Sequence, residues 1–395
     1  MRVKRPRFLG FVLDDYPFLD IDSLLRGAVE PVTVRQVYAL SILRGESVAL
    51  DTDEFELVTT TPSADWVEAE NDEQARKLGH AGVLLCDADE PELAELRERH
   101  DRLERLGWHL EAALYYFLTK WHGVDLRILA GQDDAADLLP PTDEAVREFV
   151  GRHGPAPTPF RSLAAPVSVH PLPAVEGSGD IYETLARRRT TRSFDRAIPL
   201  PLEQLALVLD TVFGFRGYVP LFGEVTTLKR TSPSAGGFHP VDAYPLLTNV
   251  EGLQPGLYHY DARGHALELI EPLAGDEAHA LASSFLCGQT YFGDAHAVVL
   301  LAARFERAFW KYRNHAKALT ALLMDAAHLS QTLYLVATDL ELGAFVTAAI
   351  NNRDIEDRLG LDGVAHGVLA ACGVGLPAER PSPFDPRFLP LEPVR

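Results

Sequence analysis

Residues 187–195 read RRRTTRSFD, and this stretch reverses the sign of the charge carried by the rest of the chain. Five arginines stand between Arg187 and Arg196 against the single acid Asp195, in a chain whose formal net charge is -20. A guanidinium group donates two parallel hydrogen bonds to a phosphate and keeps its charge, and Thr190 adds a hydroxyl donor. The stretch therefore predicts an anion site, with a solvated basic helix end as the alternative.

The composition limits what kind of partner the anion belongs to. With 395 residues, 47% of them hydrophobic and 24% charged, the chain is long enough for one large and one small domain. Its net negative charge would repel nucleic acids and anionic membrane surfaces. No run of 18 apolar residues occurs, and Asp14 and Asp15 interrupt the short apolar run near the start, so neither a membrane helix nor a signal peptide is expected. We therefore expect a cytoplasmic protein.

Short motifs of hydrolases and metal enzymes are missing from the sequence. Ser234 does not stand in a G-x-S-x-G stretch, and neither H-E-x-x-H nor a P-loop occurs. Three cysteines (Cys86, Cys287 and Cys372) lie far apart without a C-x-x-C pair, which predicts buried free thiols. We expect no metal site.

The first 131 residues are expected to form a small winged-helix-like module with a connecting helix. Residues 33–50 show helical spacing followed by a short strand, and residues 53–58 are typical of a short strand or turn. Residues 91–121 predict one long helix that begins at Pro91. A Pro-, Gly- and acid-rich stretch follows over residues 132–179, which indicates a linker or a segment that wraps another subunit.

Residues 180–395 are expected to form the main domain, with an α+β fold. Apolar residues at helical spacing run from Leu319 to Leu340 and predict a long buried helix. Residues 296–305 and 366–375 are nearly continuous apolar runs, as in strands buried on both faces. A hairpin is predicted around a turn at residues 262–264.

A second unusual stretch, SPSAGGFHPVDAY over residues 232–244, lies 40 residues after the arginines. Pro233 and Ser234 favour a turn, and the small residues Ala235, Gly236 and Gly237 would let a flat ligand approach the backbone. An ordinary glycine-rich loop before a strand is the alternative.

Taken together, the two stretches resemble the nitroreductase-like flavoprotein family, in which an Arg-Arg-Ser-x-Arg-x-Phe segment grips the FMN phosphate and a Pro-Ser-(Ser/Ala) segment lies along the flavin ring. Residues 249–270 look like the subgroup of SagB-type and McbC-type dehydrogenases, which oxidise thiazoline and oxazoline rings of ribosomal peptides to azoles. Residues 326–362 are similar to the family's long helix and the loop after it. The resemblance implies a nitroreductase-like FMN fold: a mixed central sheet flanked by helices, with a long buried helix.

The resemblance also implies which residues bind FMN. The phosphate and ribityl hydroxyls would be held by Arg188, Arg189, Thr190 and Arg192. One side of the ring would face Pro233, Ser234, Ala235 and Gly236, and the other Thr347, Ala348 and Ala349. Thr190 stands where the family more often has Ser, and Ala348-Ala349 where it often has Gly-Gly or Glu-Gly.

Lys311 and Tyr312 match a Lys-Tyr pair that the azoline dehydrogenases are thought to use for proton handling. Aromatising an azoline removes a Cα proton and a hydride, so a base is needed. Neighbours in a regular helix point about 100° apart, so both side chains can face one substrate only where the backbone is irregular. A snorkelling lysine beside a half-buried tyrosine is the alternative.

Three functions are therefore considered. The first is an FMN-dependent dehydrogenase of peptide maturation, with a precursor peptide as substrate, a cyclodehydratase as partner, and a homodimer as the assembly that the resemblance implies. The second is an NAD(P)H-dependent nitro, quinone or enone reductase. The third is a non-catalytic scaffold that binds peptide through residues 1–125.

Overall fold

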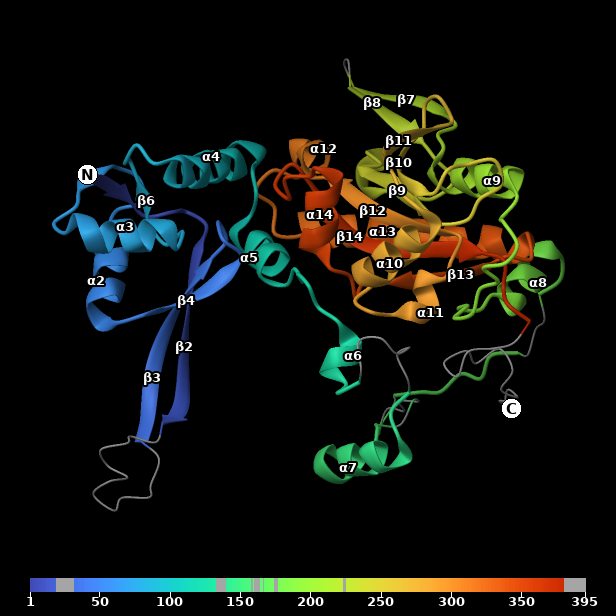
Figure 1. The fold of residues 1–395 in the computed structure, drawn as a ribbon, viewed down its shortest axis with the longest axis horizontal. Helices are drawn as coiled ribbons and strands as arrows, with labels where there is room; N and C mark the ends of the chain where they lie inside the picture. Colours follow the sequence, from blue (N-terminus) through green and yellow to red (C-terminus); the bar gives the residue numbers. More distant parts are fainter. Residues whose placement is uncertain are drawn as a thin grey trace.

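The computed structural model describes residues 1–18, 32–132, 140–157, 159, 164–165, 167–173, 177–222 and 225–379. Parts of the predicted linker, and the last 16 residues of the predicted main domain, lie outside this described part. An elongated N-terminal half stands beside a larger C-terminal half built on a central sheet (Figure 1). Within the described residues, no helix is long and apolar enough to cross a membrane.

The C-terminal half is built on a six-stranded sheet in the order β11-β10-β9-β12-β14-β13. Its strands are β9 (Val241–Leu247), β10 (Gly256–Asp261), β11 (Ala266–Pro272), β12 (Ala297–Arg304), β13 (Gly343–Thr347) and β14 (His366–Gly375). The predicted strands and hairpin are confirmed, but the expected mixed sheet is wrong, because every neighbouring pair is antiparallel. The parallel strands β12 and β13 are kept apart because β14, last in the chain, inserts between them.

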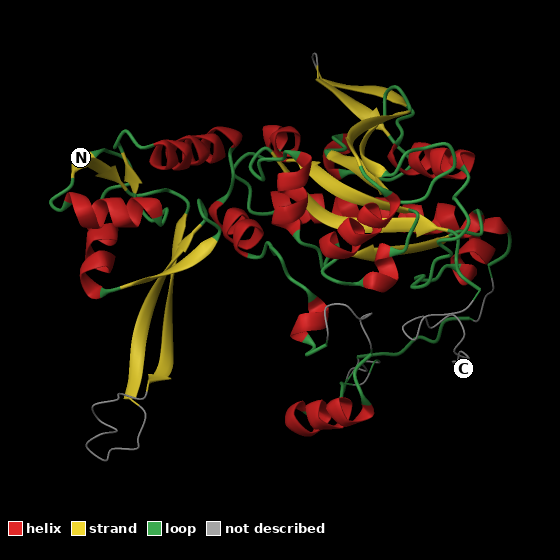
Figure 2. Cartoon of the chain, in the orientation of Figure 1, coloured by secondary structure: helices red, strands yellow, loops and turns green. Residues whose placement is uncertain are grey.

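Helices cover both faces of this sheet (Figure 2). They are α8 (Asp180–Arg187), α9 (Leu202–Phe213), α10 (Gly275–Phe285), α11 (Thr290–Gly293), α12 (Phe305–Lys311), α13 (Ala318–Asp339) and α14 (Asn352–Leu359). Alternate residues of β12 pack into two different clusters: Val299 and Leu301 with α9 and α13, and Val298 and Leu300 with α10 and α14. Burial on both faces explains the continuous apolar sequence of this strand.

The long helix α13 is confirmed, but one side of it is exposed. Leu322, Ala326 and Leu329 are buried, whereas Leu323, Met324 and Gln331 are exposed. Because the Gln331 side chain is exposed to water, its amide needs no hydrogen-bond partner within the chain. The cysteines are free and buried, as expected.

The N-terminal half consists of strands β1 (Arg2–Lys4), β2 (Leu9–Phe18), β3 (Val32–Ser41), β4 (Glu46–Leu50), β5 (Val67–Glu68) and β6 (Leu85–Cys86), and helices α2 (Thr52–Thr60), α3 (Asp72–His80), α4 (Pro91–Leu106) and α5 (Leu110–Leu118). The helix expected within residues 33–50 is wrong, because this segment forms the β3–β4 hairpin, turned at Gly45 with φ 68°. The strand or turn expected at residues 53–58 is helix α2, which begins with a capping box between Asp51 and Glu54. The single helix expected over residues 91–121 is broken at Gly107, where φ is 77°.

Helix α6 (Leu126–Leu129) ends the predicted N-terminal module, and helix α7 (Asp143–His153) lies within the predicted linker region. The rest of the described chain includes the hairpin of β7 (Gly217–Phe222) and β8 (Val225–Lys229) and the short 3-10 turn η1 (Ala235–Gly237). All side chains of α7 are exposed. The boundaries at residues 131 and 179 remain a prediction.

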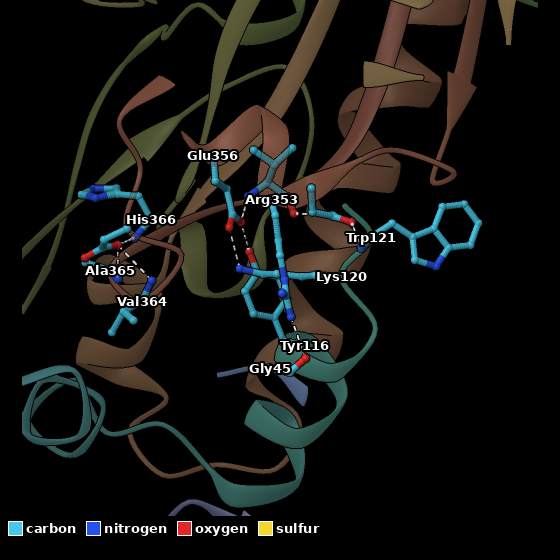
Figure 3. A network of polar contacts seen from close by, with 12 residues as sticks. Gly45, Tyr116, Lys120, Trp121, Arg353, Glu356, Val364, Ala365 and His366 are labelled. Atoms are coloured by element: carbon cyan, nitrogen blue, oxygen red, sulfur yellow. Dashed lines mark hydrogen bonds and ion pairs between the residues drawn. The ribbon is translucent and has the colours of Figure 1, made fainter. Parts of the chain in front are cut away.

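The two halves share one core and a buried polar network. Trp108 and Phe117 belong to the same apolar cluster as α9 and α13. Beside them, the Glu356 carboxylate accepts a hydrogen bond from the Tyr116 hydroxyl at 2.8 Å and pairs with Lys120 Nζ at 2.6 Å (Figure 3). Arg353 donates to the Gly45 carbonyl at 2.6 Å. The N-terminal half therefore packs directly against the C-terminal half, at α14 and the shared apolar cluster.

Candidate active site

The arginine segment begins where helix α8 ends. Arg188 has ψ 128°, so the chain leaves the helix there, and the backbone N–H of Thr191 donates to the carbonyl of Ala344 in β13 at 2.8 Å. The Thr190 hydroxyl lies 2.9 Å from the hydroxyl of Tyr334 in α13, and the Arg188 guanidinium lies 5.2 Å from the centre of the same ring. Arg188 and Thr190 therefore meet at one residue of the long helix.

The five arginines do not act as one cluster. Arg196 pairs with Asp294 at 3.4 Å and with Asp276 at 3.7 Å, and Arg187 is exposed at the end of α8. Arg192 lies 5.9 Å from the centre of the Phe292 ring. The other predicted donors are Arg188, Arg189, Arg192 and the Thr190 hydroxyl, and their chemistry fits a phosphate.

The loop with Pro233 and Ser234 is held by a buried acid that the sequence analysis missed. Asp325 of α13 is only 4% exposed and accepts hydrogen bonds from the Ser234 hydroxyl at 2.6 Å and from the N–H of Ala235 at 3.0 Å. Ser234 in turn accepts from the N–H of His239 at 2.9 Å. Burial raises the pKa of Asp325, against the hydrogen bonds, which lower it. An acid in the apolar row of the long helix was the signal that could have found this residue.

The structure brings the proton-handling candidates to the same loop. Gly236 has φ 64°, and a Cβ atom there would lie 2.6 Å from Lys311 Nζ and 3.0 Å from the Tyr312 hydroxyl. Helix α12 ends at Lys311, and Tyr312 already has ψ 39°, so the backbone is irregular between them. Both side chains therefore lie close to the same glycine, although neighbouring side chains in a regular helix would point about 100° apart.

The third predicted segment, Thr347 to Ala349, begins with the last residue of β13. The buried Gln289 side chain donates to the Ala349 carbonyl at 3.0 Å, and the N–H of Ala349 donates to the Thr347 hydroxyl at 3.1 Å. Ala348 between them is exposed. Gln289 thus fixes the shape of this turn, although nothing in the sequence marks it as a site residue.

All three segments lie against α13 or β13. The Ser234 loop meets α13 at Asp325, and the arginine segment meets it at Tyr334, nine residues or about 14 Å further along the helix. An elongated ligand with an anionic group at one end and a flat group at the other would fit this arrangement. Glycine is required at position 236 because a Cβ atom there would crowd Lys311 Nζ and the Tyr312 hydroxyl, so the loop and these two side chains fit closely together.

Replacing Asp325 by leucine is expected to loosen the Ser234 loop. The Ser234 hydroxyl and the Ala235 N–H would lose their acceptor, and each buried unsatisfied group costs about 1–3 kcal/mol. Urea unfolding would measure the loss. Asp325→Asn keeps one acceptor oxygen and should lose less stability. Equal stability of Asp325→Leu and wild type would show that the loop does not depend on this acid.

Comparison with known proteins identifies the family that the C-terminal half resembles. Residues 185–376 match the Nitroreductase family. The nitroreductase-like protein MJ1384 of Methanocaldococcus jannaschii is 29% identical over 182 residues, which cover 45% of this chain and 83% of that protein. The trifolitoxin-processing protein TfxB of Rhizobium leguminosarum bv. trifolii is also 29% identical over 182 residues, which cover 44% of this chain and 48% of that protein.

Solved structures with the same kind of domain are more distant. A chain of the E. coli microcin synthetase McbBCD complex with truncated pro-MccB17 bound is 18% identical, with a TM-score of 0.49, over 74% of this chain and 99% of that one. A nitroreductase-like protein from Ralstonia eutropha is 23% identical, with a TM-score of 0.40, over 56% of this chain and 99% of that one. On the family match and the fold described above, residues 185–376 form a nitroreductase-family domain, preceded by a separate N-terminal region.

Proposed function

We propose that the chain is an FMN-dependent dehydrogenase that oxidises thiazoline or oxazoline rings of a ribosomally made peptide to thiazole or oxazole. The observation that carries the proposal is the approach of Lys311 and Tyr312 to Gly236, in the loop that the family resemblance assigns to the flavin ring. The similarity to a trifolitoxin-processing protein supports peptide maturation over other oxidations.

The residues present fit the cofactor that the family implies. Arg188, Arg189, Thr190 and Arg192 would hold the phosphate and ribityl chain, while Pro233, Ser234, Ala235 and Gly236 and the segment Thr347, Ala348 and Ala349 would lie against the ring. FMN, when bound there, supplies an acceptor for the hydride equivalent that an azoline loses on aromatisation. Asp325 and Gln289 keep the two ring-facing segments in shape.

The chain's own part in the reaction is to take a proton. Aromatisation removes one proton from Cα of the azoline and one hydride from Cβ, and the proton needs a base. Either Lys311 Nζ or the phenolic oxygen of Tyr312 would take this proton. The Phe238 ring, 5.5 Å from Lys311 Nζ, provides an apolar neighbour on one side.

We also propose binding partners for the chain. The exposed Met324 of α13 and Val346 of the edge strand β13 support a second copy of this chain as a partner. The N-terminal half would help to engage the precursor peptide or a cyclodehydratase.

An NAD(P)H-dependent reductase of nitro, quinone or enone compounds is the second candidate, favoured by the similarity to MJ1384. Mass spectrometry decides between the two candidates. Wild-type protein supplied with FMN, a synthetic thiazoline or oxazoline peptide and a quinone as final electron acceptor should remove two hydrogen atoms from the peptide. NAD(P)H oxidation with a nitro compound or quinone, and no change in peptide mass, would favour the reductase.

A further inference from the structure

A cavity of about 300 Å³ lies where the N-terminal half meets the nitroreductase-family domain. Tyr115 of helix α5 and Trp121, three residues beyond the end of that helix, line one side. The first turns of α13 line another with Leu319 and Leu323, and the floor includes Ala348 of the turn after β13. We name this cavity the α5 pocket.

The walls of the α5 pocket are apolar in character, although three polar residues border it. Lys120 is neutralised by Glu356 at 2.6 Å, the Thr119 hydroxyl donates to the Tyr115 carbonyl at 2.6 Å, and the Asn352 amide donates to the Val368 carbonyl at 3.2 Å. These groups are thus engaged within the chain. A ligand would meet mainly aromatic and aliphatic surface, which favours an apolar group over a charged one.

Two aromatic side chains are available to such a ligand. Tyr115 is 59% exposed and Trp121 is 39% exposed. The Trp121 ring points away from the Lys120–Glu356 pair rather than into the buried network (Figure 3). Burying these rings against an apolar side chain would therefore stabilise a complex without disturbing the contact between the two halves.

The α5 pocket adjoins the candidate active site at Ala348, which belongs both to the pocket and to the segment assigned to the flavin ring. Leu319 and Leu323 face the pocket from one side of α13. Ala321 and Leu322, on other sides of the same turns, line a small cavity together with Tyr312. Helix α13 thus contributes side chains both to the pocket and to the surroundings of the proton-handling pair.

We propose that the α5 pocket takes the large apolar side chain of the residue next to the azoline ring, so that the N-terminal half selects the substrate. This inference rests on the proposed function. The volume of about 300 Å³ leaves room for a large side chain and lies at the lower end of the roughly 300–1,000 Å³ of small-molecule sites. Full burial of a Phe or Leu side chain is worth about 1.5–3 kcal/mol, which corresponds to a preference of about 10- to 100-fold.

Two measurements, each made on a pair of peptides, test this proposal. The first is kcat/KM with FMN and quinone for thiazoline peptides that carry Phe or Gly beside the ring. The second is calorimetric affinity for the corresponding thiazole peptides, which does not require turnover. Wild type should favour the Phe peptide about tenfold or more, and Leu323→Trp, which fills the pocket, should remove most of that preference. Tyr115→Ala should reduce it, whereas Tyr218→Ala, at a tyrosine 58% exposed on the β7–β8 hairpin, should not.

The outcomes separate this inference from the proposed function. If wild type oxidises both peptides equally and the variants change nothing, the pocket proposal is overturned while the proposed function stands. If neither peptide is oxidised, the proposed function fails. The pocket proposal is then judged by the calorimetric affinities, and equal affinity of the two thiazole peptides would overturn it as well. If Leu323→Trp alters sedimentation of the protein but leaves the preference intact, the pocket is a contact between copies and the proposal is wrong.

Discussion

Replacing Tyr312 by phenylalanine, or Lys311 by methionine, is expected to lower kcat/KM for azoline oxidation by about 10²- to 10⁴-fold. The magnitude is that of a lost general base. Both side chains reach Gly236, so removal of either one interrupts proton transfer at the ring-facing loop. Initial rates for the azoline peptide, measured by mass spectrometry, give the effect, and the flavin absorbance of each variant shows that the cofactor is retained.

The matched control is Lys317→Met, which removes an exposed lysine six residues further along the chain and leaves the site untouched. Its rate should equal that of wild type. The two single variants also identify the base. If Lys311→Met is the more damaged and its remaining rate no longer varies with pH, Lys311 takes the proton. Wild-type rates in both variants would remove the pair from the mechanism.

Lys120→Met is expected to cost about 3–5 kcal/mol in the free energy of unfolding, because it leaves the Glu356 carboxylate buried without its cation. Tyr116 and the backbone N–H of Val368 still donate to Glu356, at 2.8 Å and 3.1 Å, but neither carries a charge. Urea unfolding measures the loss. The double variant Lys120→Met with Glu356→Gln should recover much of it, because the carboxylate that Lys120 neutralises is then removed as well.

Arg35→Met is the control, since Arg35 pairs with Asp15 at 2.9 Å, both side chains are exposed, and loss of the pair should change little. Equal effects at Lys120 and Arg35 would contradict the buried-pair account.

The pH dependence provides a second test of the Lys120 network. Burial lowers the pKa of Lys120 to about 8 from its ordinary value of 10.5, although Glu356 acts in the opposite direction. Between these two values the unfolded chain holds a proton that the folded chain has released. The contribution of Lys120 to the free energy of unfolding therefore rises with pH across this window. That rise should be missing in Lys120→Met, and an unchanged pH profile would refute the assignment.

Much of the C-terminal fold could be predicted because its elements have strong local patterns. Strands β12 and β14 are buried on both faces and α13 is apolar over five turns, so each has a distinctive sequence. The N-terminal half was harder because its elements are short. Residues 33–50 mix helical and alternating spacing, and the hairpin they form is decided by pairing with β2.

The site was predictable only where it is continuous in sequence. The arginine segment and the Ser234 loop could be found because several of their residues are adjacent. Asp325 and Gln289 could not, because they meet their partners across about 90 and 60 residues of chain and carry no motif. Similarly, charge alone did not reveal that Arg196 is turned toward Asp276 and Asp294.

The absorbance spectrum of freshly purified protein, with the released chromophore identified, tests the central claim that residues 188–192 bind FMN. Wild type and Arg196→Ala should be yellow and release FMN, since Arg196 pairs with acids elsewhere. Arg188→Ala combined with Arg192→Ala should be colourless, because the phosphate loses two guanidinium groups. A wild-type protein that is colourless and takes up no added FMN would contradict the account.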